Sequence, residues 1–474
     1  MSHVSHESRP RTHGEDPCQA TCDSIRRRLR DGFRSIRERR VTRMGNTPSG
    51  RAVAPGLEAV RSPAMTSPPA APLAYDDAAE RRHIEIRSEF LLDPDVVFLN
   101  HGSFGACPRP VFERYQAWQR ELERQPVEFL SRRERGLLAD ARSELAKYLH
   151  VGSDDVVYVP NVTTALNIVA RSLPLEPGDE ILTTDHEYGA LERTWTFVAE
   201  HRQARLVIQP LPMPLIDPDE VVEAVWAGVS EHTRVLFLSH ITSPTAVTLP
   251  IEPLIARARA AGIWTVIDGA HAPGQIDLNL ADLDVDFYGG NCHKWLSSPK
   301  GAGFLYVRPE VQHLIEPVVV SWGWRPRDPW STPFVDAIQR QATQDISAYL
   351  SVPAAIDYQR ERDWPSVRRE CHELVRMARR EMTRITGLEP LVADDPSWFA
   401  QMATLPLPAS CDAASLKKQL WDEYRVEIPA TGWDEAPCLR VSVQGYNTRS
   451  DIERLLDAVR ALLPSVLTRT DGSA

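Results

Sequence analysis

Lysine is the residue type that first points to chemistry in this sequence. The 474 residues include five lysines, and arginine supplies the other basic charge. An amine can lose its proton and act as a nucleophile, whereas a guanidinium cannot. Lys294 follows an apolar run that ends at Tyr288, just after Gly289 and Gly290. Paired glycines allow a sharp turn and a close approach to a ligand. We interpret Lys294 as a nucleophile, with an ordinary surface lysine as the alternative.

A carboxylate ends a second apolar run, Trp264–Ile267. Asp268 follows this run directly, and His271 lies three residues further on. A buried carboxylate is costly without a cationic partner. A protonated pyridine nitrogen would be such a partner, and the carboxylate would keep that ring an electron sink. A helix cap and a metal ligand are the alternatives, but we find no further converging ligands for a metal.

Two more polar segments follow apolar runs. Pro160–Ala165 contains Thr163 and Thr164 at the expected start of a helix, where hydroxyls and free N–H groups bind anions or cap the helix. Thr184–Tyr188 contains His186, whose imidazole could stack on an aromatic ring; alone it would be an ordinary loop residue. An amine, a carboxylate, an anion site and a stacking group thus each follow a predicted strand.

The elements that must position these residues alternate between short β-branched runs and amphipathic segments. Such alternation predicts a mostly parallel sheet covered by helices on both faces, with the ligand site at the carboxyl ends of the strands. The predicted helices here include 138–149, 166–173 and 254–261, and the predicted strands are 96–99, 156–159, 180–183, 205–208, 235–238, 264–267, 286–288 and 303–307. Beyond about residue 335 we expect a smaller α+β domain with helices at 348–362, 364–386, 414–424 and 452–462 and a strand at 439–443.

Length and composition favour a soluble, two-domain protein of a reducing cytoplasm. The net charge of −11 argues against nucleic-acid binding, and no apolar run suits a membrane span or a secretory signal. Seven scattered cysteines do not form a disulfide framework, and Cys18 with Cys22 lacks the partner pair of a zinc site. Residues 1–75 are rich in Arg, Pro and Ser, and we expect a disordered extension that is either dispensable or a targeting arm.

The sequence resembles the class V aminotransferases, a branch of the fold-type I enzymes that use pyridoxal 5'-phosphate (PLP). The resemblance covers roughly residues 90–465 and is strongest to the isopenicillin N epimerase-like subfamily. It is carried by Phe98–Pro108, Gln125–Leu130, Asp185–Ala190 and Leu439–Thr448, together with Asn161–Ala165, Asp268–His271 and His293-Lys294. It implies a large PLP-binding α/β domain (76–335) with a mostly parallel seven-stranded sheet and an N-terminal segment that contributes to the small domain, a smaller α+β domain (336–474), and a homodimer.

The resemblance also implies residue roles. Lys294 would form the Schiff base, Asp268 would pair with the ring nitrogen, and His186 would stack on the ring. His271 would lie near the ring hydroxyl, and Arg440 would bind the substrate carboxylate. The remaining implied contacts are the phosphate site, formed by Thr163, Thr164, Asn291, His293 and the partner's Thr343, and the substrate pocket, lined by Asn100 and His101. Relatives usually have glycine where this chain has Ala342, which weakens the match at Thr343.

The resemblance leaves the reaction open among epimerisation, transamination and β-elimination of the C–S lyase kind. Epimerisation needs a second acid, for which His186, Tyr188 or a residue of the facing subunit are candidates. A cysteine desulfurase would need a mobile cysteine in the loop 427–437, which has none; Cys438 lies too close to Arg440. A scaffold without turnover is the alternative from another class of protein. Arg325 and Arg327 are candidates for a second substrate cation, whereas Trp322, Trp324 and Trp433 fit a core or a dimer interface better than a pocket.

Overall fold

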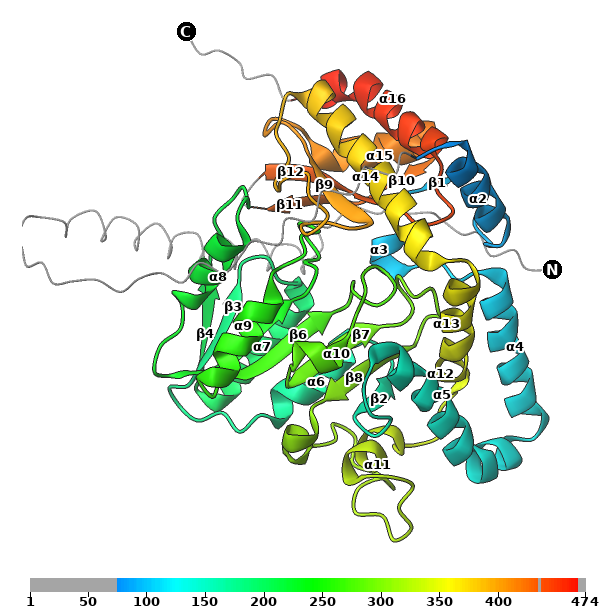
Figure 1. Ribbon diagram of the computed structural model, residues 1–474, viewed down its shortest axis with the longest axis vertical. Coiled ribbons are helices and arrows are strands. Elements are labelled where there is room, and N and C mark those ends of the chain that lie inside the picture. Colours follow the sequence, from blue (N-terminus) through cyan, green and yellow to red (C-terminus); the bar gives the residue numbers. More distant parts are fainter. Residues whose placement is uncertain (1–74, 434–435, 468–474) are drawn as a thin grey trace, which may run out of the picture. The chain divides into compact units, whose positions relative to one another are not determined.

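The computed structural model describes residues 75–433 and 436–467 (Figure 1). The predicted disordered extension falls almost wholly outside this part of the chain. Within it, no helix is both long enough and apolar enough to cross a membrane, and no group of acidic, histidine or cysteine side chains is arranged to hold a metal ion. The domain boundary near residue 335 stays a prediction.

A seven-stranded sheet forms the larger layer. Its order is β2-β8-β7-β6-β5-β3-β4, and every pairing is parallel except the two made by β8. The mostly parallel seven-stranded sheet that the sequence predicts is therefore confirmed. The strands are β2 (Val156–Val159), β3 (Glu180–Thr184), β4 (Arg205–Gln209), β5 (Thr233–Ser239), β6 (Trp264–Gly269), β7 (Phe287–Asn291) and β8 (Gly303–Val307).

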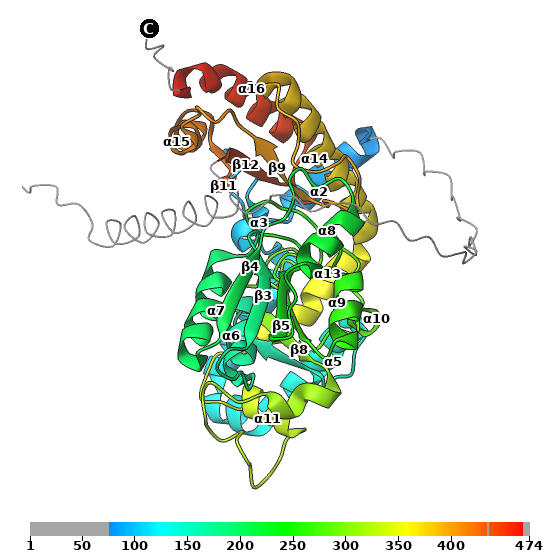
Figure 2. The ribbon, with the colours of Figure 1, turned by 90° about the vertical axis from the view of Figure 1, so that its left-hand side faces the viewer.

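Two apolar cores lie on opposite faces of this sheet, because side chains alternate along each strand. In β5, Val235 and Phe237 join one core, while Leu236 and Leu238 join the other. The first core is covered by α6 (Val162–Ser172), α7 (Gly189–Arg202) and α11 (Pro333–Gln339), and the second by α5 (Glu134–Leu149), α8 (Pro218–Trp226), α9 (Ile251–Ala260), α12 (Ser347–Leu350) and α13 (Val352–Glu361). Figure 2 shows α6 and α7 on one side of the strands and α9 on the other.

A second, antiparallel sheet has the order β11-β12-β9. Its strands are β9 (Met402–Pro406), β11 (Ala430–Trp433) and β12 (Ala436–Ser442), with α14 (Trp364–Thr386), α15 (Ala413–Tyr424) and α16 (Arg449–Val466) packed nearby. The predicted strand 96–99 forms as β1 (Val97–Phe98) and pairs with β10 (Val426–Glu427) instead of joining the large sheet. The remaining helices are α2 (Asp77–Ser88), α3 (His101–Phe104), α4 (Arg109–Arg124), α10 (Leu280–Leu283), the π-helix Glu128–Arg133 and the 3-10 helix Pro309–Leu314.

The strand directions bring the predicted chemical residues to one edge. Strands β3, β5, β6 and β7 are parallel, and β2 points the same way because β8 is antiparallel to both β2 and β7. The segments that follow these strands therefore meet at their carboxyl ends, where open parallel sheets bind ligands.

Candidate active site

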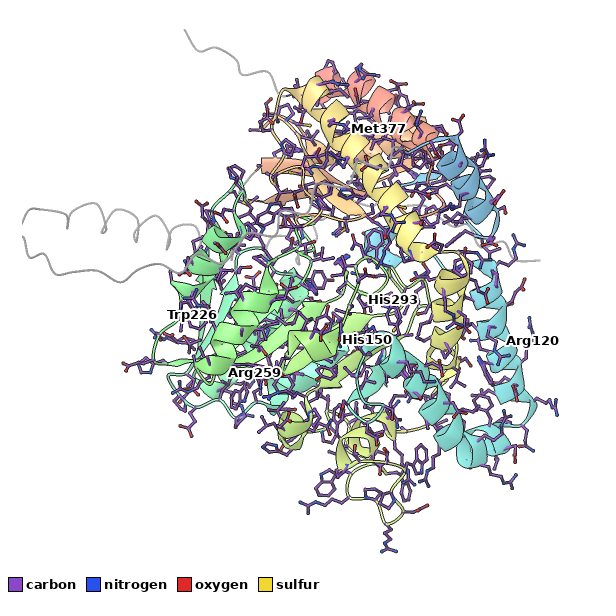
Figure 3. All side chains as sticks on the ribbon, viewed as in Figure 1. Arg120, His150, Trp226, Arg259, His293 and Met377 are labelled. Carbon is purple, nitrogen blue, oxygen red and sulfur yellow. The ribbon has the colours of Figure 1, made fainter. Side chains whose placement is uncertain are left out.

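Lys294 lies in a tightly held loop three residues after β7. Its main-chain oxygen accepts a hydrogen bond from His101 Nε2 at 2.9 Å, and the neighbouring His293 oxygen is so close to Gly105 that a Cβ there would lie 2.0 Å away. Gly105 also has φ of +70°, so glycine suits this close approach for two reasons. Figure 3 marks His293 near α3. The loop thus fixes the lysine backbone while the side chain stays partly exposed.

The amine of Lys294 is influenced by three charged or polar groups, those of His271, Asp268 and Arg440. Nζ is 3.3 Å from His271 Nε2. Burial lowers the pKa of Lys294 to about 8; the Asp268 charge opposes this shift and the Arg440 charge adds to it. An amine with this pKa is about one-tenth unprotonated at pH 7, far more than an ordinary lysine, and the unprotonated form is the one that acts as a nucleophile or general base.

Asp268 lies on β6 and is 2% exposed. The Ala270 N–H donates to Oδ1 at 2.8 Å. Burial raises the pKa of Asp268 to about 6, although the Ala270 N–H and the positive charge of Lys294 lower it. A buried carboxylate with these neighbours is suited to a further cationic partner.

His186 follows β3 and is fully buried. Its Nδ1 lies 2.8 Å from Thr245 Oγ1, and Thr245 in turn contacts the Thr242 hydroxyl at 2.8 Å. Burial lowers the pKa of His186 to about 4, so the ring is a neutral imidazole at neutral pH. A neutral, fixed ring is suited to stacking.

The start of α6 is arranged for an anion. The Asn291 Oδ1 accepts from the Val162 N–H at 3.0 Å, and Asn161 Oδ1 accepts from the Thr164 N–H at 2.9 Å. Among the described residues the Thr163 N–H has no acceptor, so it can donate to a ligand. Two residues after Asn291, His293 donates from Nδ1 to the Ala302 oxygen at 3.0 Å, and burial lowers the pKa of His293 to about 4.

Arg440 reaches this edge from β12 of the small sheet and is 5% exposed. One terminal nitrogen donates to the Ser243 oxygen at 2.5 Å, and the other donates to Ser103 Oγ at 3.1 Å. Its buried Nε finds no partner among the described residues, and burial lowers the pKa of Arg440 to about 10. A buried guanidinium with an unused donor is suited to an anionic ligand such as a carboxylate.

Asn100 and His101 occupy different surroundings. Asn100 Oδ1 accepts from the same Ser103 hydroxyl at 2.5 Å, and Asn100 Nδ2 donates to Glu427 at 2.9 Å, so Asn100 supports the Arg440 contact. His101 is fully buried, with Nδ1 at 2.9 Å from the Tyr446 hydroxyl and Nε2 at the Lys294 oxygen. Both ring nitrogens of His101 are thus engaged inside the protein, and its place in the substrate pocket stays a prediction.

Thr343 is separate from the strand-end residues. It is exposed and lies in a hollow lined also by Leu130, Trp322 and Trp330. Trp322 is 78% exposed and Trp324 is 49% exposed, which excludes the core position considered for them within one protomer. Arg325 and Arg327 are exposed in the same segment, and Arg325 stacks on Trp324 at 4.5 Å.

Several residues of this site escaped the sequence reasoning. Thr245 holds His186, Ser239 bonds to a buried Glu187, and Trp295 Nε1 donates to His271 Nδ1 at 3.2 Å. Glu187 and Trp295 are direct neighbours of His186 and Lys294 in sequence, which was the available signal. Nothing in the sequence marks Thr245 and Ser239, because their partners belong to other segments.

The residues that converge here fit PLP. An amine suits its aldehyde, a buried carboxylate suits its pyridine nitrogen, and a free N–H at a helix start suits its phosphate. When bound, the cofactor supplies an electron-accepting ring conjugated to the substrate amine.

Comparison with known proteins agrees with this fit. The family model for aminotransferase class V matches residues 106–455. The chain belongs to this family and is a PLP-dependent enzyme. It is 40% identical to isopenicillin N epimerase of Amycolatopsis lactamdurans over 79% of this chain and 97% of that protein. It is 28% identical to a probable chloroplastic L-cysteine desulfhydrase of Arabidopsis thaliana over 80% and 86% of the two chains. A cysteine desulfurase of Escherichia coli shares the fold, with a TM-score of 0.70 at 22% identity over 81% of this chain and 99% of that one.

Proposed function

We propose that this enzyme epimerises the α-carbon of an amino acid, in the manner implied by its resemblance to isopenicillin N epimerase. The observation that carries the proposal is the proximity of Arg440 to Lys294, close enough for the guanidinium to lower the pKa of the amine. A substrate carboxylate held at Arg440 puts its α-carbon near Lys294 Nζ, which removes the proton. Support for epimerisation itself comes from the 40% identity over 97% of the epimerase from Amycolatopsis lactamdurans.

Within this chain, Thr163, Thr164, Asn291 and His293 would hold the phosphate, while Asp268 would face the ring nitrogen and His186 the ring. The second acid of an epimerase returns a proton to the other face of the α-carbon. His186 is poorly suited, because its Nδ1 is engaged by Thr245 and burial lowers the pKa of His186 to about 4. Tyr188 is 44% exposed at the start of α7 and remains the candidate from this chain.

Cysteine chemistry of the desulfurase kind finds no suitable thiol among the described residues. Cys438 lies within β12 and is 2% exposed. Burial raises the pKa of Cys438 to about 11, whereas a nucleophilic cysteine needs a lowered value and a mobile loop. The five described cysteines are all free thiols, which agrees with the cytoplasmic location that we propose.

We infer a homodimer from the surface around Thr343. Five large apolar side chains crowd one exposed segment, where Val318 is 53%, Val320 66% and Trp322 78% exposed, with Val319 and Trp324 beside them. Such a patch is usual for an interface and unusual for a free surface. A second subunit seated there would bring the partner's Thr343 to the phosphate. Light scattering of the PLP-loaded protein should give twice the chain mass, and Trp322→Glu should give the single mass.

The reaction is tested by incubating the PLP-loaded enzyme with isopenicillin N, L-aminoadipate, L-cysteine and other amino acids in deuterated water. Deuterium at the α-carbon together with inversion is the expected result. Pyruvate with ammonia would instead show β-elimination, and a keto acid with aminated cofactor would show transamination. Lys294→Ala is the control, since any exchange that survives it does not use this amine.

A further inference from the structure

Trp295 is a fully buried tryptophan directly after Lys294. Its indole Nε1 donates to His271 Nδ1 at 3.2 Å, and its main-chain oxygen accepts from Gln359 Nε2 at 2.7 Å. Its ring packs against His101, with ring centroids 5.0 Å apart. The indole is therefore held in place from several directions.

The hydrogen bond from Trp295 determines where the His271 proton lies. An indole N–H can only donate, so Nδ1 of His271 must accept and carries no hydrogen. A neutral imidazole then carries its hydrogen on Nε2. Burial and the nearby positive charges of Lys294 and Arg440 lower the pKa of His271 well below its usual value, which keeps the ring neutral.

The other nitrogen of the ring faces the reactive lysine. Nε2 of His271 lies 3.3 Å from Lys294 Nζ. Because Nε2 carries the hydrogen, Nζ must accept, and only an unprotonated amine has a lone pair to do so. An ammonium at Nζ would place two donors against each other and lose this hydrogen bond.

We propose that Trp295 is a positioning residue that fixes the His271 proton on Nε2 and thereby favours the unprotonated amine of Lys294. The other charged or titratable groups that act on this pair are Asp268, Arg440 and His101. The carboxylate of Asp268 favours the ammonium, and the guanidinium of Arg440 disfavours it. Trp295 thus supports the form that captures an aldehyde. The inference rests on the proposed function only in taking Lys294 as the residue that captures the cofactor.

The first test follows PLP capture by the apoprotein as a function of pH and needs no substrate. The capture rate should rise with pH and then level off, with a midpoint near pH 8, which is the pKa of Lys294. Trp295→Phe keeps an aromatic ring but removes the indole donor. The hydrogen of His271 can then move to Nδ1, and His271 Nε2 can accept a hydrogen bond from the Lys294 ammonium. We expect the midpoint to move up by about one pH unit and capture below it to slow about tenfold.

The double variant separates the proton position from packing. A glutamine at position 271 donates from its amide whatever Trp295 does, so Trp295→Phe should cause no further shift in a His271→Gln background. An equal shift in both backgrounds would overturn the proposal, because Trp295 would then act through packing alone. The proposal would also be overturned if Trp295→Phe left the capture midpoint of the otherwise unchanged enzyme where it is.

A matched control and a direct measurement complete the test. Trp195 is also fully buried, and its Nε1 has no partner within residues 75–433 and 436–467, so Trp195→Phe should cost stability without moving the capture midpoint. Nitrogen-15 NMR of the apoprotein should show the hydrogen of His271 on Nε2, and in Trp295→Phe a mixture of both forms. A hydrogen on Nδ1 in the parent protein would contradict the inference even if no amino acid were turned over.

Discussion

Glu187 Oε2 accepts a hydrogen bond from Ser239 Oγ at 2.5 Å, and Ser239 is the register partner of Asp268 in the adjacent strand. The other oxygen, Oε1, accepts from the Thr184 hydroxyl at 2.8 Å. Burial and the charge of Asp268 raise the pKa of Glu187 to about 8 despite these two hydrogen bonds. His186, next to Glu187 in the sequence, and His240, next to Ser239, are neutral, because burial lowers the pKa of each to about 4. The pair of buried carboxyls thus carries one negative charge near neutral pH, on Asp268.

Glu187→Gln should change how stability depends on pH. A raised pKa in the folded state stabilises the fold below pH 4.5, and this contribution is lost as pH rises toward 8. The free energy of unfolding of the parent should therefore fall with pH in that window by up to about 1.4 kcal/mol per unit more than that of Glu187→Gln. Urea titrations at several pH values measure this difference. Parallel curves for the two proteins would show that Glu187 is ionised throughout.

Lys294→Ala should abolish capture of the cofactor and lower turnover about 10³-fold or more, because the nucleophile and the base are lost together. Borohydride reduction followed by mass spectrometry should find the cofactor attached to the parent at this residue and no adduct in the variant. Lys300→Ala removes an exposed lysine six residues away and serves as the control. A stable adduct in Lys294→Ala would assign the chemistry to another amine.

Arg440→Lys should raise KM for amino acids about 10- to 100-fold, because the ammonium of a lysine cannot form the bidentate hydrogen-bonded pair that a guanidinium forms with a carboxylate. The kcat should change less, and an amine without the carboxylate should bind equally well to both proteins. Arg379→Lys is a matched control, since Arg379 is similarly buried, at 4% exposed, and contacts main-chain oxygens of residues 392 and 393, a nearby carboxylate and the ring of Phe399. An unchanged KM in Arg440→Lys would remove this residue from the substrate site.

Asp268→Asn should reduce kcat about 100-fold and shift the absorption of the bound cofactor, because the amide cannot hold a pyridine nitrogen protonated. Asp286→Asn is the comparison. Asp286 is equally buried at 2% but bonds to Thr265 and Arg308, so its loss should affect unfolding and leave the spectrum unchanged. Identical spectra for the parent and Asp268→Asn would exclude the ring contact.

The strands of the large sheet could be predicted to within about three residues because buried parallel strands are continuous β-branched and apolar runs. The meeting of Lys294, Asp268, His186 and Thr163 at one edge followed from the strand directions alone. Other elements gave weaker signals. Helix α7 begins among loop residues and was not predicted, and β9 and β11 are short strands whose pairing depends on β12. The predicted helix 348–362 divides at Ser351 into α12 and α13.

Side-chain surroundings were harder to predict than positions. The pattern around His101 is polar and glycine-rich, which is equally typical of a pocket wall and of a buried hydrogen-bonding site. Only the structure shows the Tyr446 hydroxyl and the Lys294 oxygen at its two nitrogens. Contacts of this kind join segments more than a hundred residues apart, so they cannot be predicted from the local sequence.

Arg440 already contacts Ser243, which follows β5, and Ser103 in α3, so its guanidinium is anchored to two other segments before any ligand arrives. The side chain of Arg440 has therefore lost its rotamer freedom on folding, before an incoming carboxylate binds. Such preorganisation lowers the entropy cost of recognition and makes the fit strict. We expect this enzyme to discriminate sharply against analogues whose carboxylate is displaced by a single methylene group.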